Sequence, residues 1–430
     1  MDFRRLAGTT ALVAVTVCCA SADDIKLPGD WRGSIHGFGL VNYSVRPDLE
    51  ASPQGDGLGE YGFLLADQRV QLKLEAHSPK GAVSLLAKPE FFYDAVDEEF
   101  GADLREGYLD FSHKAWDMRV GRQILTWGVG DLVFINDVFP KDYVAFFSGR
   151  PIEYLKLGVD AAAVNVQSEA LSAEWVVIPS GLFTPDSLPQ RGRFFQFDPF
   201  PALPRETREP PAQLKNIESA LRFYRTVVET ELSVYAYHGF WRSFALQPDN
   251  PGAPTRTIET LPELAVFGAS ARRRGLGGVW GAEIGYYDSL GDRRGTNPAI
   301  ENAQFRFLVT YQRQLAQDLI GSLEYYGEWM QDYAAYRRSV PTGFPVRPEL
   351  RDLIGLRLTK LLRYQTFKLS LFTFYSPMAG DFFLNPEISY NFTDRLWAAL
   401  GGNIFGGLGE SFFGQLGRND NVYVAVRYSF

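Results

Sequence analysis

The feature that most constrains the fold is an alternation of polar and apolar residues that recurs along the whole chain. The clearest example is the segment 69–76, in which Arg69, Gln71, Lys73 and Glu75 alternate with four apolar residues. Successive residues of a β-strand point to opposite faces, so each such segment predicts a strand with one polar and one apolar face. A soluble antiparallel sheet needs the same alternation, because it also buries one face. The repetition of the pattern favours a membrane barrel, since about ten residues of tilted strand cross a bilayer.

The chain from residue 23 to residue 430 therefore predicts one all-β domain, a transmembrane up-and-down antiparallel β-barrel of about eighteen strands. A helical span is not expected, because beyond the first residues the sequence contains no apolar run of about eighteen residues. We place the strands near residues 32–43, 63–77, 82–93, 103–113, 116–127, 160–167, 171–178, 218–227, 229–240, 263–272, 277–287, 302–315, 317–330, 350–362, 365–375, 381–391, 396–405 and 421–430.

The connections between these segments alternate in length, as an up-and-down barrel requires. Short turns are expected at 78–81, 114–115, 168–170, 273–275, 363–364 and 393–395. Long loops are expected near 44–62, 128–159, 179–217, 241–262, 288–301, 331–349 and 406–420. With both termini in the periplasm, this alternation puts every short turn on the periplasmic side and every long loop outside. The proline-rich segment 179–211 predicts a lid, an inward loop or a disordered stretch.

Tryptophan is expected where hydrocarbon meets the headgroups, because its ring is amphipathic. Six tryptophans lie at or near predicted strand ends, and Trp175 and Trp280 do not fit this placement. The six are Trp31, Trp116, Trp127, Trp241, Trp329 and Trp397.

Both ends of the chain carry export signals. Arg4 and Arg5, an apolar stretch and a small-residue site before Asp23 have the layout of a secretory signal peptide over residues 1–22. The final segment alternates strictly and ends in Phe430, which resembles the signal read by the outer-membrane barrel assembly machinery. An ordinary edge strand of a soluble sheet is the alternative. We expect a protein of the cell outer membrane of a Gram-negative bacterium, in contact with outer-membrane lipid and lipopolysaccharide.

The expected mature chain excludes several classes of site and partner. Both cysteines, Cys18 and Cys19, fall in the expected leader, which excludes disulfides and thiolate metal sites. Removing the leader leaves 41 of 43 basic and 50 of 51 acidic residues, so the net charge is about nine negative and nucleic acid is not expected as a partner.

The segment 119–143 carries a resemblance to a known family. The run Gly121-Arg122-Gln123, followed by Trp127-Gly128 and then by Asp131, Asp137 and Pro140, resembles the strand and inward loop of alginate-export-like and related porin-like outer-membrane proteins. The resemblance implies an eighteen-stranded pore whose segment 128–159 folds inward as a constriction loop. We expect that loop, with Asp131, Asp137, Lys141 and Asp142, to decide what enters.

The strand register predicts which charged side chains line the lumen, and the two signs nearly balance. A strongly anion-selective tunnel needs an excess of positive charge at a narrow point, so alginate is not the expected solute. Pairing of opposite charges along the wall, which would stiffen it, is the alternative to a role in passage. The inward bases are Arg69, Lys73, Lys88, Arg119, Arg222, Arg306, Arg357, Lys368, Arg395 and Arg427; the inward acids are Glu75, Glu90, Glu106, Asp110, Glu231, Glu283, Glu324, Glu328 and Glu387.

The sequence does not predict an enzyme, a cofactor or a metal site. The four histidines, His36, His77, His113 and His238, lie on separate predicted strands, and no G-x-S-x-G or H-E-x-x-H motif is present. The predicted function is a porin or channel for passive or facilitated passage of small polar or charged solutes. The alternatives are a transporter for hydrophobic compounds, a barrel partner of an export or efflux system, and a structural sheath or adhesion surface with a closed lumen.

Overall fold

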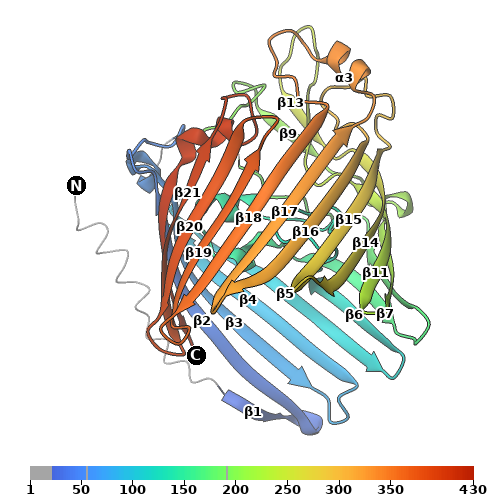
Figure 1. The fold of residues 1–430 in the computed structure, drawn as a ribbon, viewed down its shortest axis with the longest axis vertical. Helices are drawn as coiled ribbons and strands as arrows, with labels where there is room; N and C mark the ends of the chain where they lie inside the picture. Colours follow the sequence, from blue (N-terminus) through green and yellow to red (C-terminus); the bar gives the residue numbers. More distant parts are fainter. Residues whose placement is uncertain (1–21, 55–56, 190–191) are drawn as a thin grey trace.

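A computed structural model describes residues 22–54, 57–189 and 192–430, and in this part of the chain eighteen antiparallel strands form a closed barrel (Figure 1). Each strand pairs with its sequence neighbours in the wall, and β2 pairs with β22 to close it. The predicted fold class is confirmed. The wall consists of β2 (Trp31–Val45), β3 (Phe63–His77), β4 (Val83–Asp94), β5 (Glu99–His113), β6 (Trp116–Gln123), β7 (Val159–Val166), β8 (Ser172–Ile178), β10 (Glu218–Val227), β11 (Thr230–Phe240), β14 (Glu263–Gly275), β15 (Gly278–Ser289), β16 (Gln304–Ala316), β17 (Leu319–Met330), β18 (Leu350–Leu362), β19 (Phe367–Ser376), β20 (Asp381–Asn391), β21 (Leu396–Gly406) and β22 (Asn421–Ser429).

The remaining elements lie outside the wall strands. A short strand, β1 (Ala22–Leu27), pairs with the start of β2 below the barrel in Figure 1. A second sheet at the opposite end joins β9 (Arg205–Arg208), β12 (Ala245–Pro248) and β13 (Thr257–Thr260). The helical segments are η1 (Pro28–Asp30), η2 (Gly57–Tyr61), α2 (Tyr143–Ser148), η3 (Ile152–Leu155), η4 (Leu214–Asn216), α3 (Tyr333–Ser339) and η5 (Gly414–Asn419). Among the described residues, none of the helices has the length and apolar character needed to cross a membrane.

The two ends of the barrel differ in their connections, and we call them the turn end and the loop end. The turn end carries 78–82, 114–115, 167–171, 228–229, 276–277, 317–318, 363–366 and 392–395. The loop end carries 46–62, 95–98, 124–158, 179–217, 241–262, 290–303, 331–349, 377–380 and 407–420. Two details of the prediction were wrong. Residues 273–275 belong to β14 and the turn follows at Leu276, and two loop-end connections, 95–98 and 377–380, are as short as turns.

The two faces of the wall separate as the alternation predicted. In β22, Val422 and Val424 are 45% and 43% exposed on the outer face, whereas Tyr423 and Ala425 are buried on the inner face. Phe430 is also buried, because its ring lies where a side chain at Gly37 would stand and its backbone exchanges two hydrogen bonds with Gly37. The glycine therefore provides the space that the terminal ring fills.

The tryptophan prediction was wrong for half of the residues on which it rested. Trp127 and Trp241 are buried, and Trp397 packs on a buried cluster. Trp175 and Trp280, which do not fit the predicted placement, are 51% and 38% exposed. Trp116 and Trp329, which do fit it, are exposed to a similar extent, 39% and 50%. Apart from Ala22, the first residue of β1, the predicted signal peptide lies outside the described residues.

Candidate functional site: the lumen and its loop

The connection between β6 and β7, residues 124–158, leaves the wall and contacts inward side chains of strands around the barrel; we call it the lumen loop. It begins four residues earlier than predicted, because β6 ends at Gln123. Gly121, Arg122 and Gln123 are consequently wall residues, not loop residues. Arg122 pairs with Asp160 on β7 at 2.9 Å, and Gln123 donates to a backbone carbonyl of β7. Gly121 has a φ of 129°, and a side chain there would collide with the backbone of β5.

One buried carboxylate, Glu283 on β15, holds the tip of the lumen loop, residues 128–136. It accepts hydrogen bonds from the backbone N–H groups of Val129 at 2.8 Å, Gly130 at 3.3 Å and Asn136 at 2.7 Å, and from the Asn136 amide at 2.9 Å. Gly128, at the start of the tip, has a φ of 81°, and a side chain there would meet the same carboxylate. Hydrogen bonds from amides to a charged acceptor are among the stronger ones in proteins, so Glu283 fixes the tip against the wall.

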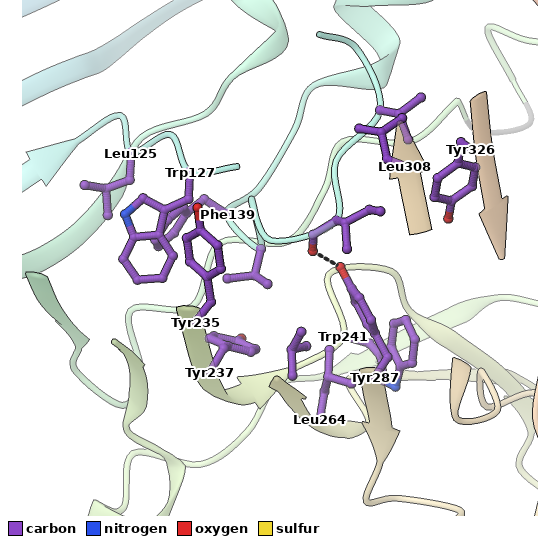
Figure 2. Packing of buried hydrophobic residues seen from close by; sticks show 14 of the residues in the cluster. Leu125, Trp127, Phe139, Tyr235, Tyr237, Trp241, Leu264, Tyr287, Leu308 and Tyr326 are labelled. Atoms are coloured by element: carbon purple, nitrogen blue, oxygen red, sulfur yellow. Dashed lines mark hydrogen bonds between the residues drawn. The ribbon is translucent and has the colours of Figure 1, made fainter. Parts of the chain in front are cut away.

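Three further wall residues hold the lumen loop along its path. Trp127 donates from Nε1 to Glu174 on β8 at 2.9 Å, and Arg357 on β18 pairs with Asp131 at 3.0 Å. Tyr287 on β15 donates from its hydroxyl to the carbonyl of Ile135, the bond drawn in Figure 2. The sequence placed Arg357 and Glu283 on the inner face but did not identify Glu174 or Tyr287, since nothing local marks their contacts with the loop.

The lumen loop buries an apolar cluster inside the barrel. Trp127 packs edge-on against Phe139 and close to Tyr235, and Figure 2 shows these rings facing one another between loop and wall. Ile135 and Leu308 are almost fully buried in the same cluster. Burial of apolar side chains against the inner wall means that this part of the lumen is packed with protein.

The charged residues expected to decide entry are mostly engaged within the loop itself. Asp137 is buried and pairs with Lys141 at 3.0 Å and with Lys156 at 3.2 Å. Pro140, which directly precedes Lys141, is also buried. Burial lowers the pKa of Lys141. Burial also raises the pKa of Asp186, which accepts from the Lys141 backbone N–H at 2.7 Å, to about 6. Of the four charged residues predicted to face solutes, Asp131 keeps the largest exposed fraction of its side chain, 36%.

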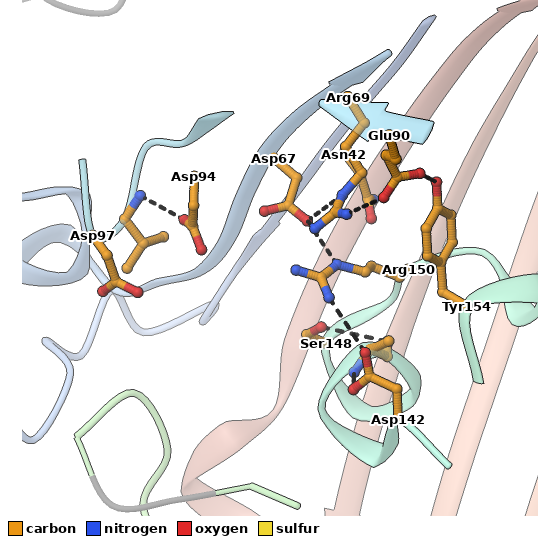
Figure 3. Close-up of polar contacts among 12 residues, drawn as sticks. Asn42, Asp67, Arg69, Glu90, Asp94, Asp97, Asp142, Ser148, Arg150 and Tyr154 are labelled. Atoms are coloured by element: carbon orange, nitrogen blue, oxygen red, sulfur yellow. Dashed lines mark hydrogen bonds and ion pairs between the residues drawn. The ribbon is translucent and has the colours of Figure 1, made fainter. Parts of the chain in front are cut away.

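A second network fastens the other half of the lumen loop to β3 and β4 (Figure 3). Asp142 caps α2 by accepting from the Ala145 backbone N–H, and Arg150 follows the helix and pairs with Asp67 on β3 at 2.6 Å. Asp67 also pairs with Arg69, which reaches Glu90 on β4 at 2.5 Å. These charges are nearly fully buried, so each depends on its partners to offset the loss of water.

Nearly all the predicted inward charges lie in ion pairs along the inner wall. Arg395 is the exception among the bases, because it lies exposed in the 392–395 turn. Apart from Arg69 and Arg357, described above, the pairs are Lys73–Glu75 at 2.8 Å, Lys88–Glu106 at 2.5 Å, Arg119–Asp110 at 2.9 Å, Arg222–Glu231 at 3.0 Å, Arg306–Glu328 at 3.6 Å, Lys368–Glu387 at 3.4 Å and Arg427 with Glu153 of the loop at 2.9 Å.

Exposure divides these pairs into two sets. Near the turn end, Lys73 and Lys368 keep 40% and 41% of their side chains exposed, and Arg119 keeps 36%. Near the loop end, Arg69 and Arg306 keep 7% and 16%. The lumen is therefore open to solvent toward the turn end and filled by the lumen loop toward the loop end.

A pocket of about 430 Å³ opens above the lumen loop at the loop end. Half of its lining residues are polar or charged, including Ser52, Asp94, Asp97, Ser187 and Arg193. Segment 179–211 was predicted to form a lid, an inward loop or a disordered stretch. Its described residues, 179–189 and 192–211, contact both the lumen loop and the sheet at the loop end. Residues 186–187 bind the lumen loop, and β9 joins the sheet at the loop end.

The histidines are not brought together into a site. His36, His77, His113 and His238 lie on β2, β3, β5 and β11. Among residues 22–54, 57–189 and 192–430, no cluster of three or more histidine, cysteine or acidic side chains is arranged to hold a metal ion.

No protein-family profile matches the chain, and no curated protein matches it. Among solved structures, it is similar to OccK5 (OpdH) of Pseudomonas aeruginosa, with 12% sequence identity, a TM-score of 0.54 and coverage of 93% of this chain and 98% of that chain. It is also similar to OccK2 (OpdF) of Pseudomonas aeruginosa in complex with glucuronate, with 10% identity, a TM-score of 0.55 and coverage of 93% and 98%.

At these identities the likeness shows the fold. The porin-like part of the expected resemblance is supported, whereas its alginate-export-like part has no support from these structures. The chain thus has the closed eighteen-stranded barrel fold of the outer-membrane porins.

Proposed function

We propose that the chain is an outer-membrane channel for passive or facilitated passage of small polar or charged solutes. The observation that carries this proposal is the solvent-open lumen toward the turn end, lined by half-exposed ion pairs inside a wall whose outer face is apolar. Water and fixed charges within a hydrocarbon-facing barrel provide a polar path across a membrane. The lumen loop, at the loop end of that path, would set its narrowest point.

The residues proposed to line the path are those with solvent-accessible charges. They are Lys73, Glu75, Lys88, Arg119, Arg222, Arg357, Lys368, Glu387 and Arg427, with Asp131 at the loop tip. The similar OccK2 structure contains glucuronate, a small charged solute, which supports the same class of solute here. The turn end would face the periplasm and the loop end the outside, after export by the predicted signal peptide and assembly through Phe430.

A transporter for hydrophobic compounds is the rival proposal, and it requires an apolar cavity under the long loops. One apolar pocket, of about 460 Å³, is lined by Phe307, Trp329 and Leu350, but these residues lie on the outer face of the wall. The pocket against the lumen loop carries Asp94, Asp97 and Arg193 instead. Burying apolar surface against charged groups costs their hydration, so this lining favours a polar solute.

The experiment is ion conductance of the mature chain in planar bilayers, compared with a variant that lacks residues 129–135 of the loop tip. We expect discrete conductance steps from the intact chain and larger steps from the variant, because the tip occupies the lumen. A deletion of equal length, residues 337–343 in the loop that carries α3, lies outside the lumen and should leave the step size unchanged (Figure 1). If neither the intact chain nor the tip deletion conducts, although both are folded, the channel proposal fails.

A further inference from the structure

Glu324, in the middle of β17, stands apart from the other carboxylates of the inner wall. It is 4% exposed, and in the described part of the chain neither carboxylate oxygen has a close, well-aligned hydrogen-bond partner. The backbone N–H of Asp131, at the loop tip, approaches it as a weaker donor. Its side chain lies over Gly355 on β18, where a Cβ would come within 2.5 Å of Oε1. The absence of a side chain at Gly355 provides the room that Glu324 occupies.

The charged groups that act on Glu324 are one acid and one base. Asp131 of the lumen-loop tip and Arg357 of β18 are paired with each other at 3.0 Å, and their side chains are 36% and 34% exposed. On β16, the residue opposite Glu324 is Thr310, which does not titrate. Glu283 on β15 is committed to the backbone of the loop tip. Two carboxyl groups therefore share one guanidinium at the point where the tip meets the wall.

This arrangement accommodates only one of the two carboxyl groups as an anion. A buried carboxylate with only one weak donor loses most of its hydration without compensation, whereas the neutral acid carries no such cost. Burial raises the pKa of Asp131, and Arg357 opposes that rise. Because Arg357 contacts Asp131 and not Glu324, the observed packing fits an ionised Asp131 beside a neutral Glu324.

We propose that Glu324 is a proton-binding site that controls whether the tip of the lumen loop is fastened to the wall through Asp131 and Arg357. When Glu324 is neutral, Arg357 holds Asp131 and the tip stays in place. When Glu324 releases its proton to the lumen water, the two carboxylates compete for Arg357 and repel each other. The part of the tip around Asp131 then loosens from the wall, while Glu283 still holds the backbone on either side of it. The inference rests on the proposed channel only in that tip release would widen the path.

The position of the tip can be followed by thiol labelling, because the expected mature chain contains no cysteine. Leu132→Cys places one thiol on the tip. We define the labelling ratio as the rate at which this thiol reacts with a charged thiol reagent in the folded chain, divided by its rate in the urea-unfolded chain at the same pH. That ratio removes the effect of thiol ionisation. We expect it to rise roughly tenfold between about pH 5 and about pH 8, equivalent to one unit of differential proton affinity.

Two variants, each made in the Leu132→Cys chain, should give opposite labelling rates. Glu324→Gln keeps the shape of a neutral acid and should label slowly at both pH values. Asp131→Asn removes the partner of Arg357 and should label fast at both. Glu169→Gln, an exposed acid in the 167–171 turn, should keep the pH dependence. If the labelling ratio does not change with pH, or if Glu324→Gln retains the change, the proposal is overturned.

Conductance separates this proposal from the channel proposal. A pH-dependent labelling ratio without conductance would support the proton site and refute the channel. Conductance with a labelling ratio that does not change with pH would support the channel and refute the proton site. Folding of Glu324→Gln is judged by heat-modifiable migration in SDS gels. If that variant does not fold, the labelling ratio of Asp131→Asn still tests the proposal. Because Asp131 keeps 36% of its side chain exposed, we expect Asp131→Asn to fold, and the proposal requires that this variant lose the pH dependence.

Discussion

Glu283→Gln tests whether one carboxylate fixes the loop tip in the lumen. The substitution keeps the shape of the side chain but replaces one acceptor oxygen with a donor. If the remaining oxygen faces Asn136, the backbone N–H groups of Val129 and Gly130 lose their acceptor. A buried donor without an acceptor costs about 1–3 kcal/mol. The bond from Gly130 is already long at 3.3 Å, so we expect a total of about 2–4 kcal/mol.

This free energy should appear as local opening of the tip while the barrel remains intact. At about 1.4 kcal/mol per factor of ten, the detached tip becomes about 30-fold to 1,000-fold more populated. Hydrogen exchange at residues 129, 130 and 136, measured in detergent micelles, should accelerate by the same factor. Glu231→Gln, on the wall near the turn end, is the matched control and should not affect these amides. Exchange in Glu283→Gln within about threefold of the wild-type rate would refute the reasoning.

Three further predictions follow from other contacts. Phe430→Ala empties the space above Gly37 and should lower the free energy of unfolding by about 3–5 kcal/mol, measured by urea titration in micelles; an unchanged midpoint contradicts it. Because its folded-state pKa is raised to about 6, Asp186 favours the folded state at low pH and loses that contribution as pH rises from about 4 to about 6, so Asp186→Asn should flatten the stability profile in this window. Arg119→Gln leaves Asp110 unpaired in the lumen and should shift the reversal potential in a KCl gradient toward cation selectivity, whereas Asp110→Asn should shift it the opposite way; shifts of the same sign exclude this lining role.

The strands could be predicted closely because their cause is local. A wall between hydrocarbon and water forces a two-residue period, and the period is visible in any short segment. β3 and β20 occupy the predicted residues without change, and the register placed Lys73 and Arg119 on the inner face. The error at β6 shows the limit. The apolar run that ends at Trp127 reads as strand, but from Ile124 onward it packs on the inside of the wall.

The sequence by itself determined that this chain forms a porin-type barrel, because solvation acts on each strand separately. The tertiary structure decided how the lumen is filled. Glu283 and Asn136 are 147 residues apart in sequence, and Arg357 and Asp131 are also distant, so no local pattern announces their contacts. Whether an inward charge is hydrated, paired or buried depends on where the lumen loop lies. That position is set by side chains from strands all around the barrel, which become neighbours only when the wall closes.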